Sequence, residues 1–139
     1  MAGFGEKSFI GIHTNIYRRS GGRIGGAIGG TPVLLLTTTG RKTGRERTTP
    51  LGYFKDGADY IVVASNGGRP QRPAWYYNLS QNPHVTIRVK DQVQPAVAST
   101  VPTEERAPLW SRIASEAPAY APYADDARDI PLVRLRPAA

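Results

Sequence analysis

Short runs of β-branched and apolar residues, each closed by a turn signal, constrain the fold of this chain more than any other feature. Gly40–Gly44 and Lys55–Gly57 are two of the turns that separate them. Helical periodicity is confined to a few segments, and strands and helices do not alternate regularly. This pattern predicts a mainly β fold, an antiparallel sheet or small barrel with helices inserted late, and argues against a doubly wound α/β fold. The predicted strands are Val33–Thr39, Arg47–Phe54, Tyr60–Ser65, Val85–Val89, Val93–Thr100 with a bend at Pro95, and Ile130–Pro137.

The predicted strands differ in how their apolar residues are arranged. Tyr60–Ser65 is a continuous apolar run, which is typical of a strand buried on both faces. Val85–Val89 alternates apolar and polar residues, and the last strand places Arg134 and Arg136 opposite its apolar side. We therefore expect those two strands to have one face in solvent.

Three segments have helical character. Lys7–Arg19 is amphipathic with a basic end, Ala74–Gln81 forms a short helix before Asn82 and Pro83, and Pro102–Ala117 forms a longer one. In the longer helix we expect Thr103 to be the N-cap and Pro108 to delay the regular part.

The glycine-rich stretch Gly21–Gly30 is interpreted as a flexible tether, because repeated interior glycines disfavour a helix and the spacing does not match a dinucleotide-binding motif. A chain of 139 residues, 40% hydrophobic, is expected to form one domain. It comprises an N-terminal helix and tether in residues 1–30 and a core in residues 31–139.

Charge and cysteine content exclude several classes of function. The formal net charge of +7 favours phosphates, acidic small molecules or anionic lipid as ligands. The chain has no cysteine, which excludes disulfides, thiolate nucleophiles and Cys-ligated metals. No stretch approaches the length of apolar sequence that crosses a bilayer, so we expect a cytoplasmic protein.

The basic segment between the first two strands carries Arg41, Lys42, Arg45 and Arg47. If those strands pair as a hairpin, Gly40 and Gly44 permit positive φ, and successive N–H groups would converge into an anion-binding concavity ringed by these cations. The alternative is a solvated basic turn that prevents edge-to-edge sheet pairing. The segment does not match the P-loop pattern.

Other chemistry is sparse. His13 and His84 each stand alone without a second ligand nearby, so no metal site is predicted. Ser65 follows an apolar strand, but no base is identified that would activate it. A protein with a phosphate-shaped loop and no activated nucleophile is expected to take its chemistry from a cofactor.

Three ordered motifs, "LLLTTTGRKTGRERTTPLGYFKDG", "YIVVASNGG" and "PAWYYNLSQNPHVTI", resemble the deazaflavin-dependent nitroreductases and quinone reductases of actinobacteria. The resemblance extends over residues 16–137 and implies a split β-barrel similar to flavin-binding oxidoreductases. It also implies a reduced 8-hydroxy-5-deazaflavin coenzyme (F-420), with its phosphate and acidic tail against the basic loop. The cofactor-binding positions it implies are Gly40, Arg41, Lys42, Thr43, Gly44, Arg47, Pro50, Ala64, Ser65, Asn66, Gly67 and Trp75. Asn66 departs from the pattern, because the family often has a Lys there, and Arg69 is a candidate replacement.

The resemblance implies a hydride-transferring oxidoreductase whose acceptor is a quinone, a nitroaromatic or a similar electron-poor compound. Tyr120 and Tyr123, three residues apart, are the candidate catalytic residues, because each offers an apolar face and a hydroxyl to the acceptor. The alternative enzyme keeps the fold and binds FMN instead, and a basic nucleic-acid-binding module is disfavoured for want of a recognised motif. The basic, amphipathic N-terminal helix suggests a peripheral position on an anionic membrane at the inner face of the cell membrane, with covering of the core as the alternative. The oligomeric state stays open.

Overall fold

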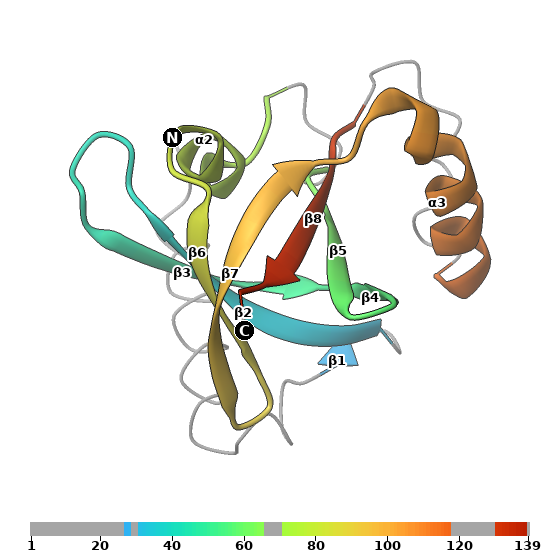
Figure 1. Ribbon diagram of the computed structural model, residues 1–139, viewed down its shortest axis with the longest axis horizontal. Coiled ribbons are helices and arrows are strands. Elements are labelled where there is room, and N and C mark those ends of the chain that lie inside the picture. Colours follow the sequence, from blue (N-terminus) through green and yellow to red (C-terminus); the bar gives the residue numbers. More distant parts are fainter. Residues whose placement is uncertain (1–26, 29–30, 66–70, 118–129, 139) are drawn as a thin grey trace.

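The computed structural model describes residues 27–28, 31–65, 71–117 and 130–138. In this part the chain is mainly β with two helices, which confirms the predicted fold class (Figure 1). The elements are β1 (Ala27–Ile28), β2 (Thr31–Thr39), β3 (Glu46–Gly52), β4 (Phe54–Asp56), β5 (Asp59–Val63), α2 (Ala74–Gln81), β6 (His84–Val89), β7 (Gln92–Thr100), α3 (Thr103–Glu116) and β8 (Leu132–Pro137).

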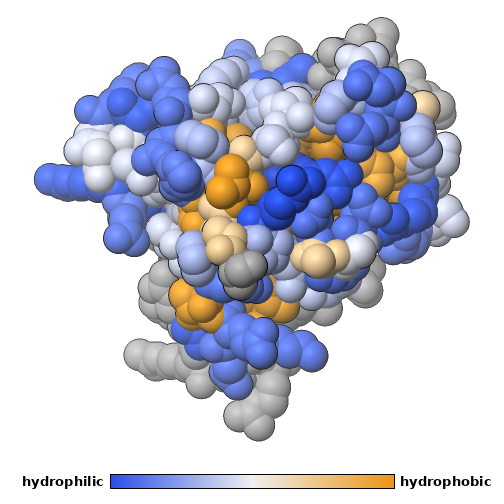
Figure 2. Space-filling view, viewed as in Figure 1, coloured by the Kyte–Doolittle hydropathy of each residue, from blue (hydrophilic) through white to orange (hydrophobic). Residues whose placement is uncertain are grey.

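All strand pairs are antiparallel, and the sheet has the order β1-β2-β6-β7-β8-β5-β4, with β3 paired to β2 off this path. The sheet curls strongly, and the β2–β3 hairpin projects from its body beside α2, while α3 lies at the opposite end (Figure 1). In the space-filling view the projecting end of this hairpin is hydrophilic (Figure 2). The predicted hairpin is therefore confirmed, and its connection stands clear of the core.

Two hydrophobic clusters lie on either side of β5. Val62 is fully buried in the larger cluster with Leu34, Leu36 and Trp75, whereas Ile61 packs in the second cluster with Trp110. Because neighbouring residues of a strand point to opposite faces, β5 contributes to both clusters, as its continuous apolar run predicts.

The longer helix differs from expectation in two details. α2 has the predicted bounds, but α3 begins at Thr103, follows Pro102 as N-cap without a side-chain capping bond, and contains Pro108. The predictions that Thr103 caps the helix and that Pro108 delays it were therefore wrong. Burial of Trp110 and Ile113 against the second cluster outweighs the hydrogen bond that proline removes.

β1 corrects part of the tether prediction. Ala27 and Ile28 pair with Pro32 and Thr31 of β2, so these two residues extend the sheet edge. The predicted helix Lys7–Arg19 and the rest of the glycine-rich stretch lie outside the described residues. Within the described residues, every helix is too short or too polar to cross a membrane.

The observed strand boundaries also differ from the predicted ones. The predicted Arg47–Phe54 strand ends at Gly52, and Phe54 opens β4, where it is buried in the second cluster. The predicted solvent side of β8 is only partly in solvent. Arg134 has a side chain that is 14% exposed, because it lies in ion pairs with Asp56 and Asp59.

Candidate functional site

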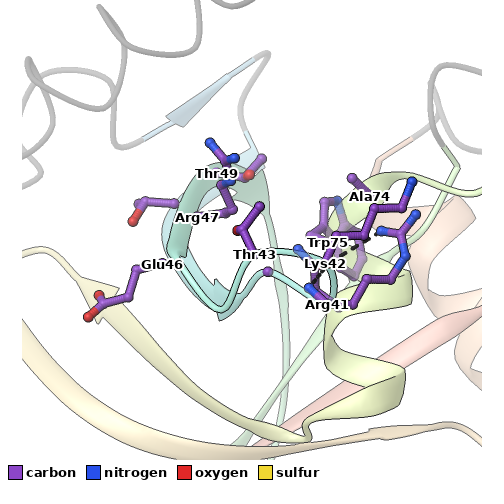
Figure 3. Close-up of a pocket in the computed structure, with 11 residues that line it drawn as sticks. Arg41, Lys42, Thr43, Glu46, Arg47, Thr49, Ala74 and Trp75 are labelled. Carbon is purple, nitrogen blue, oxygen red and sulfur yellow. Dashed lines mark hydrogen bonds between the residues drawn. The ribbon is translucent and has the colours of Figure 1, made fainter.

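A cavity of about 590 Å³ lies between the β2–β3 hairpin and the start of α2 (Figure 3). Figure 3 shows Arg41 and Lys42 beside Trp75 and Ala74, whereas Glu46 points away from α2. The wall thus joins a basic turn, one strand of the hairpin and the N-terminal half of a helix. Its residues are Gly40, Arg41, Lys42, Thr43, Glu46, Arg47, Thr48, Thr49, Ala74, Trp75 and Asn78.

Local hydrogen bonds fix the shape of the basic turn. Gly40 N–H donates to the Arg45 carbonyl at 2.7 Å, and Gly44 N–H donates to the Gly40 carbonyl at 2.8 Å. Gly44 has φ of +72°, as predicted. Gly40 does not have positive φ; a Cβ there would lie 3.0 Å from both the Arg45 carbonyl oxygen and Thr43 Oγ1. Gly40 is thus required for close approach, which corrects the predicted reason for that glycine.

Most backbone N–H groups of the turn have partners within the protein. Besides those of Gly40 and Gly44, Arg45 N–H donates to Thr43 Oγ1 at 3.2 Å and Arg41 N–H donates to Asn78 Oδ1 at 3.1 Å. These four donors are therefore not free to take part in the predicted anion-binding concavity. An anion in this cavity would be bound chiefly by side chains.

The side chains of the turn supply positive charge that stays uncompensated. The Arg41 guanidinium lies 5.1 Å from the centre of the Tyr77 ring, and its Nη1 is 3.4 Å from Asn78 Oδ1. Lys42 and Arg47 form no ion pair with any carboxylate of the described part of the chain. Cations at a protein surface attract anions most strongly where an apolar wall of low dielectric constant focuses their electric field. Trp75 provides such a wall on one side of this cavity.

The N-terminus of α2 adds a second electropositive element to the wall. Its N-cap is Pro73, which makes no side-chain capping bond, and no acidic residue occupies the first turn. Ala74 and Trp75, the first helical residues, line the cavity. The positive end of the helix dipole therefore acts together with the basic turn.

Six of the predicted cofactor-binding residues line the cavity: Gly40, Arg41, Lys42, Thr43, Arg47 and Trp75. Gly44 completes the turn. Pro50 pairs with Leu35 and is not among the residues that line the cavity. Ala64 is fully buried in the larger cluster, and Ser65 is half-buried just after β5. Asn66, Gly67, Tyr120 and Tyr123, together with Arg69 and His13, lie outside the described residues.

Sequence reasoning missed Asn78. This residue is 4% exposed on the inner side of α2 between Trp75 and Leu79, whereas the neighbouring Tyr77 is 39% exposed. The sequence signal that could have identified Asn78 is its amide between the apolar residues of a short helix. A buried polar side chain needs a hydrogen-bond partner, so an amide at that position indicates a specific contact.

The donor set fits a phosphorylated, acidic cofactor with a planar ring. Arginine and lysine bind phosphate and carboxylate, and Trp75 is buried except at the cavity wall. The described residues contain no group of three or more His, Asp or Glu side chains arranged to hold a metal ion, and His84 is exposed at the start of β6.

Comparison with known proteins gives a consistent result. Residues 10–137 match the family described as F420H2-dependent quinone reductase. The F420H2-dependent quinone reductase of Mycobacterium tuberculosis is 43% identical over 129 residues, which cover 89% of this chain and 87% of the relative. A solved structure described as an F420-H2 dependent reductase, FDR-A, has a TM-score of 0.68 at 37% identity and covers 76% of this chain and 94% of its own. Another, described as a domain-swapped dimer, has a TM-score of 0.68 at 33% identity over 91% of this chain and 95% of its own.

Proposed function

The chain belongs to the F420H2-dependent quinone reductase family, and on that basis we propose that it reduces a quinone by hydride transfer from the reduced deazaflavin coenzyme. The single observation that carries the proposal is the cavity in which unpaired cations of the basic turn lie beside Trp75. It offers a site for an acidic tail and a site for a ring within one wall.

The protein's own contribution is binding and orientation. When bound, the coenzyme supplies the hydride. Arg41, Lys42 and Arg47 bind its phosphate and acidic tail through charge-assisted hydrogen bonds. Trp75 bounds the position of the ring, and Ser65, at the end of β5, is the proposed hydrogen-bond donor to a ring carbonyl. Fixing donor and acceptor faces in contact lowers the barrier by roughly 7–11 kcal/mol in favourable cases.

The acceptor is proposed to be a quinone, with nitroaromatics as a second class because both are electron-poor planar molecules. Reduction of a quinone to its hydroquinone consumes one hydride and one proton. The hydroxyl of Tyr120 or of Tyr123 is proposed to donate that proton to the acceptor oxygen as negative charge develops on it, and the tyrosine regains a proton from solvent.

The direct test is binding and turnover with the purified full chain. We expect the protein to bind the deazaflavin coenzyme more tightly than FMN, and the reduced coenzyme to be oxidised in the presence of quinones. Tighter binding of FMN would replace the proposal with a flavin enzyme of the same fold. If the protein reduces nitroaromatics but not quinones, the acceptor class must be reassigned.

Two further properties are proposed from the sequence alone. One is a single domain over residues 1–139. The other is a cytoplasmic location with peripheral attachment to an anionic membrane through the basic residues of the segment Lys7–Arg19. A lipid quinone would be found at that surface, which gives the attachment a functional reason.

A further inference from the structure

We infer that Asn78 is a positioning residue of the cofactor site, which holds the Arg41 guanidinium in place while leaving its charge uncompensated. This inference rests on the proposed function. It assigns a role to a buried polar residue of α2 that sequence reasoning did not single out.

The amide of Asn78 joins three elements of the fold. Its Oδ1 accepts from Arg41 N–H at 3.1 Å and lies 3.4 Å from Arg41 Nη1, while its Nδ2 donates to Thr38 Oγ1 at 3.2 Å. Thr38 is 1% exposed at the end of β2, and Asn78 is 4% exposed in α2. The Asn78 side chain thus connects the end of strand β2, Arg41 of the basic turn and the helix that carries Trp75.

The direction of these bonds determines the orientation of the amide. Backbone N–H and guanidinium groups are donors only, so the atom that faces Arg41 must be the amide oxygen, which leaves the amide nitrogen to face the Thr38 hydroxyl. Tyr77, the preceding residue in α2, bounds the guanidinium from another side at 5.1 Å. Arg41 is therefore oriented by an amide oxygen and a ring face, both of them neutral.

The groups that hold Arg41 carry no charge, and this affects anion binding. A carboxylate at residue 78 would accept the same two bonds from Arg41 and would hold it at least as firmly, but it would cancel the charge that attracts an anion. Elsewhere in the molecule arginines are held in that way: Arg134 and Arg112 are oriented by Asp56. The chain therefore uses carboxylates where arginine stabilises the fold and an amide where arginine lines the cavity.

The test compares Asn78→Asp with the parent using two probes, the complete deazaflavin coenzyme and the same chromophore without its phosphate and acidic tail. Dissociation constants are measured from the fluorescence of the chromophore. We expect Asn78→Asp to weaken binding of the complete coenzyme by about tenfold or more, which is the scale of one charge-assisted hydrogen bond. Binding of the tail-less chromophore should change less than about twofold. The salt dependence of coenzyme binding should also decrease, because one free cation is lost.

Arg41→Ala provides the background that separates positioning from structure. In that background Asn78→Asp should weaken coenzyme binding less than it does in the parent, because the guanidinium that Asn78 positions is absent. Equal weakening of both probes, or the same loss with and without Arg41, would show that Asn78 only supports the fold and would overturn the inference. Because Asn78 is buried and its variant could unfold, Arg41→Lys is a second variant at an exposed position. It keeps the charge and loses the planar guanidinium, so unchanged coenzyme affinity in Arg41→Lys would also overturn the inference. If the parent protein itself does not bind the coenzyme, the proposed function fails instead.

Discussion

Arg134 on β8 donates a hydrogen bond to Asp56 at the end of β4, with 2.9 Å between Nη1 and Oδ2. The same Nη1 donates to Asp59 at 3.0 Å, and Arg112 of α3 also pairs with Asp56. These ion pairs join α3, β8 and the β4–β5 turn at the end of the molecule opposite the cavity. Arginine thus stabilises one end of this fold and remains available for ligands at the other.

The ion-pair cluster predicts a stability that depends on acid pH. The hydrogen bond from Arg134, aided by its charge and by Arg112 and opposed by partial burial, lowers the pKa of Asp56 below its ordinary value of 3.8. A carboxyl with a lowered folded-state pKa stabilises the protein above its unfolded pKa, and this stability is lost as pH falls through the folded pKa. Asp56→Asn should therefore lower the melting temperature by about 3–5 °C at neutral pH, the equivalent of about 1 kcal/mol. The difference between parent and variant should shrink below about pH 4.

The matched control is Asp91→Asn. Asp91 is exposed in the β6–β7 turn and forms no ion pair within the described residues. The Asp91→Asn variant should have the same melting temperature as the parent across the same pH range. A difference between parent and Asp56→Asn that stays constant down to pH 2 would contradict the assignment of the effect to this carboxyl.

The cations of the cavity wall should contribute to binding and little to folding. Arg41→Ala combined with Lys42→Ala should weaken coenzyme binding by roughly 100-fold, because each lost charge-assisted contact is worth about 1.5–3 kcal/mol. The melting temperature should change little, since exposed charges contribute little to stability. Arg45→Ala removes an unpaired cation of the same turn that is not on the cavity wall. If Arg45→Ala weakens binding as much as the double variant, the cavity is not the binding site.

The two glycines of the turn should respond differently to alanine. Gly44→Ala places a Cβ in open space at a φ of +72°, so it should cost about 1 kcal/mol through backbone strain. Gly40→Ala forces its Cβ against the Arg45 carbonyl and Thr43 Oγ1, so the turn must shift and coenzyme affinity should fall. Gly57→Ala, at a φ of +62° in the β4–β5 turn, has the strain without the proximity to the cavity. It should lower the melting temperature and leave the dissociation constant unchanged, and an equal loss of affinity in all three would refute the distinction.

Replacement of the candidate proton donors separates chemistry from packing. Tyr120→Phe and Tyr123→Phe remove a hydroxyl and keep the ring, so quinone turnover should fall roughly tenfold or more while coenzyme affinity holds. Steady-state rates with several quinones measure this. If both variants turn over quinones at the parental rate, neither hydroxyl donates the proton. If the alanine variants do so too, the acceptor binds elsewhere.

Flotation with anionic vesicles tests the proposed membrane attachment. The full chain should float with vesicles that contain anionic lipid, and a chain without residues 1–30 should remain in the soluble fraction. Vesicles of neutral lipid are the control. Equal partitioning of the two chains would remove the membrane proposal and leave the reductase proposal unaffected.

The sequence predicted strands, α2 and the hairpin because these depend on local patterns. Period-two alternation fixed the faces of β6, and the glycine and cation spacing marked the basic turn. It did not predict the contact between Asn78 and Arg41, because 37 residues of chain separate them and only the folded sheet brings them together. Likewise, the sequence did not predict the hydrogen bonds within the basic turn, because the spacing of its residues does not specify their partners.

The position of β8 has a consequence for how the protein is made. β8 lies between β7 and β5, so the central part of the sheet cannot be completed until residues 132–137 have left the ribosome. Until then β5, which is apolar on both faces, has β4 as its neighbour in the sheet and lacks β8 on its other edge. Nascent chains would expose an unpaired hydrophobic edge from the emergence of β5 until that of β8, a state in which chaperone binding protects against aggregation. Early stop codons upstream of this strand should therefore yield insoluble fragments rather than partly active enzyme.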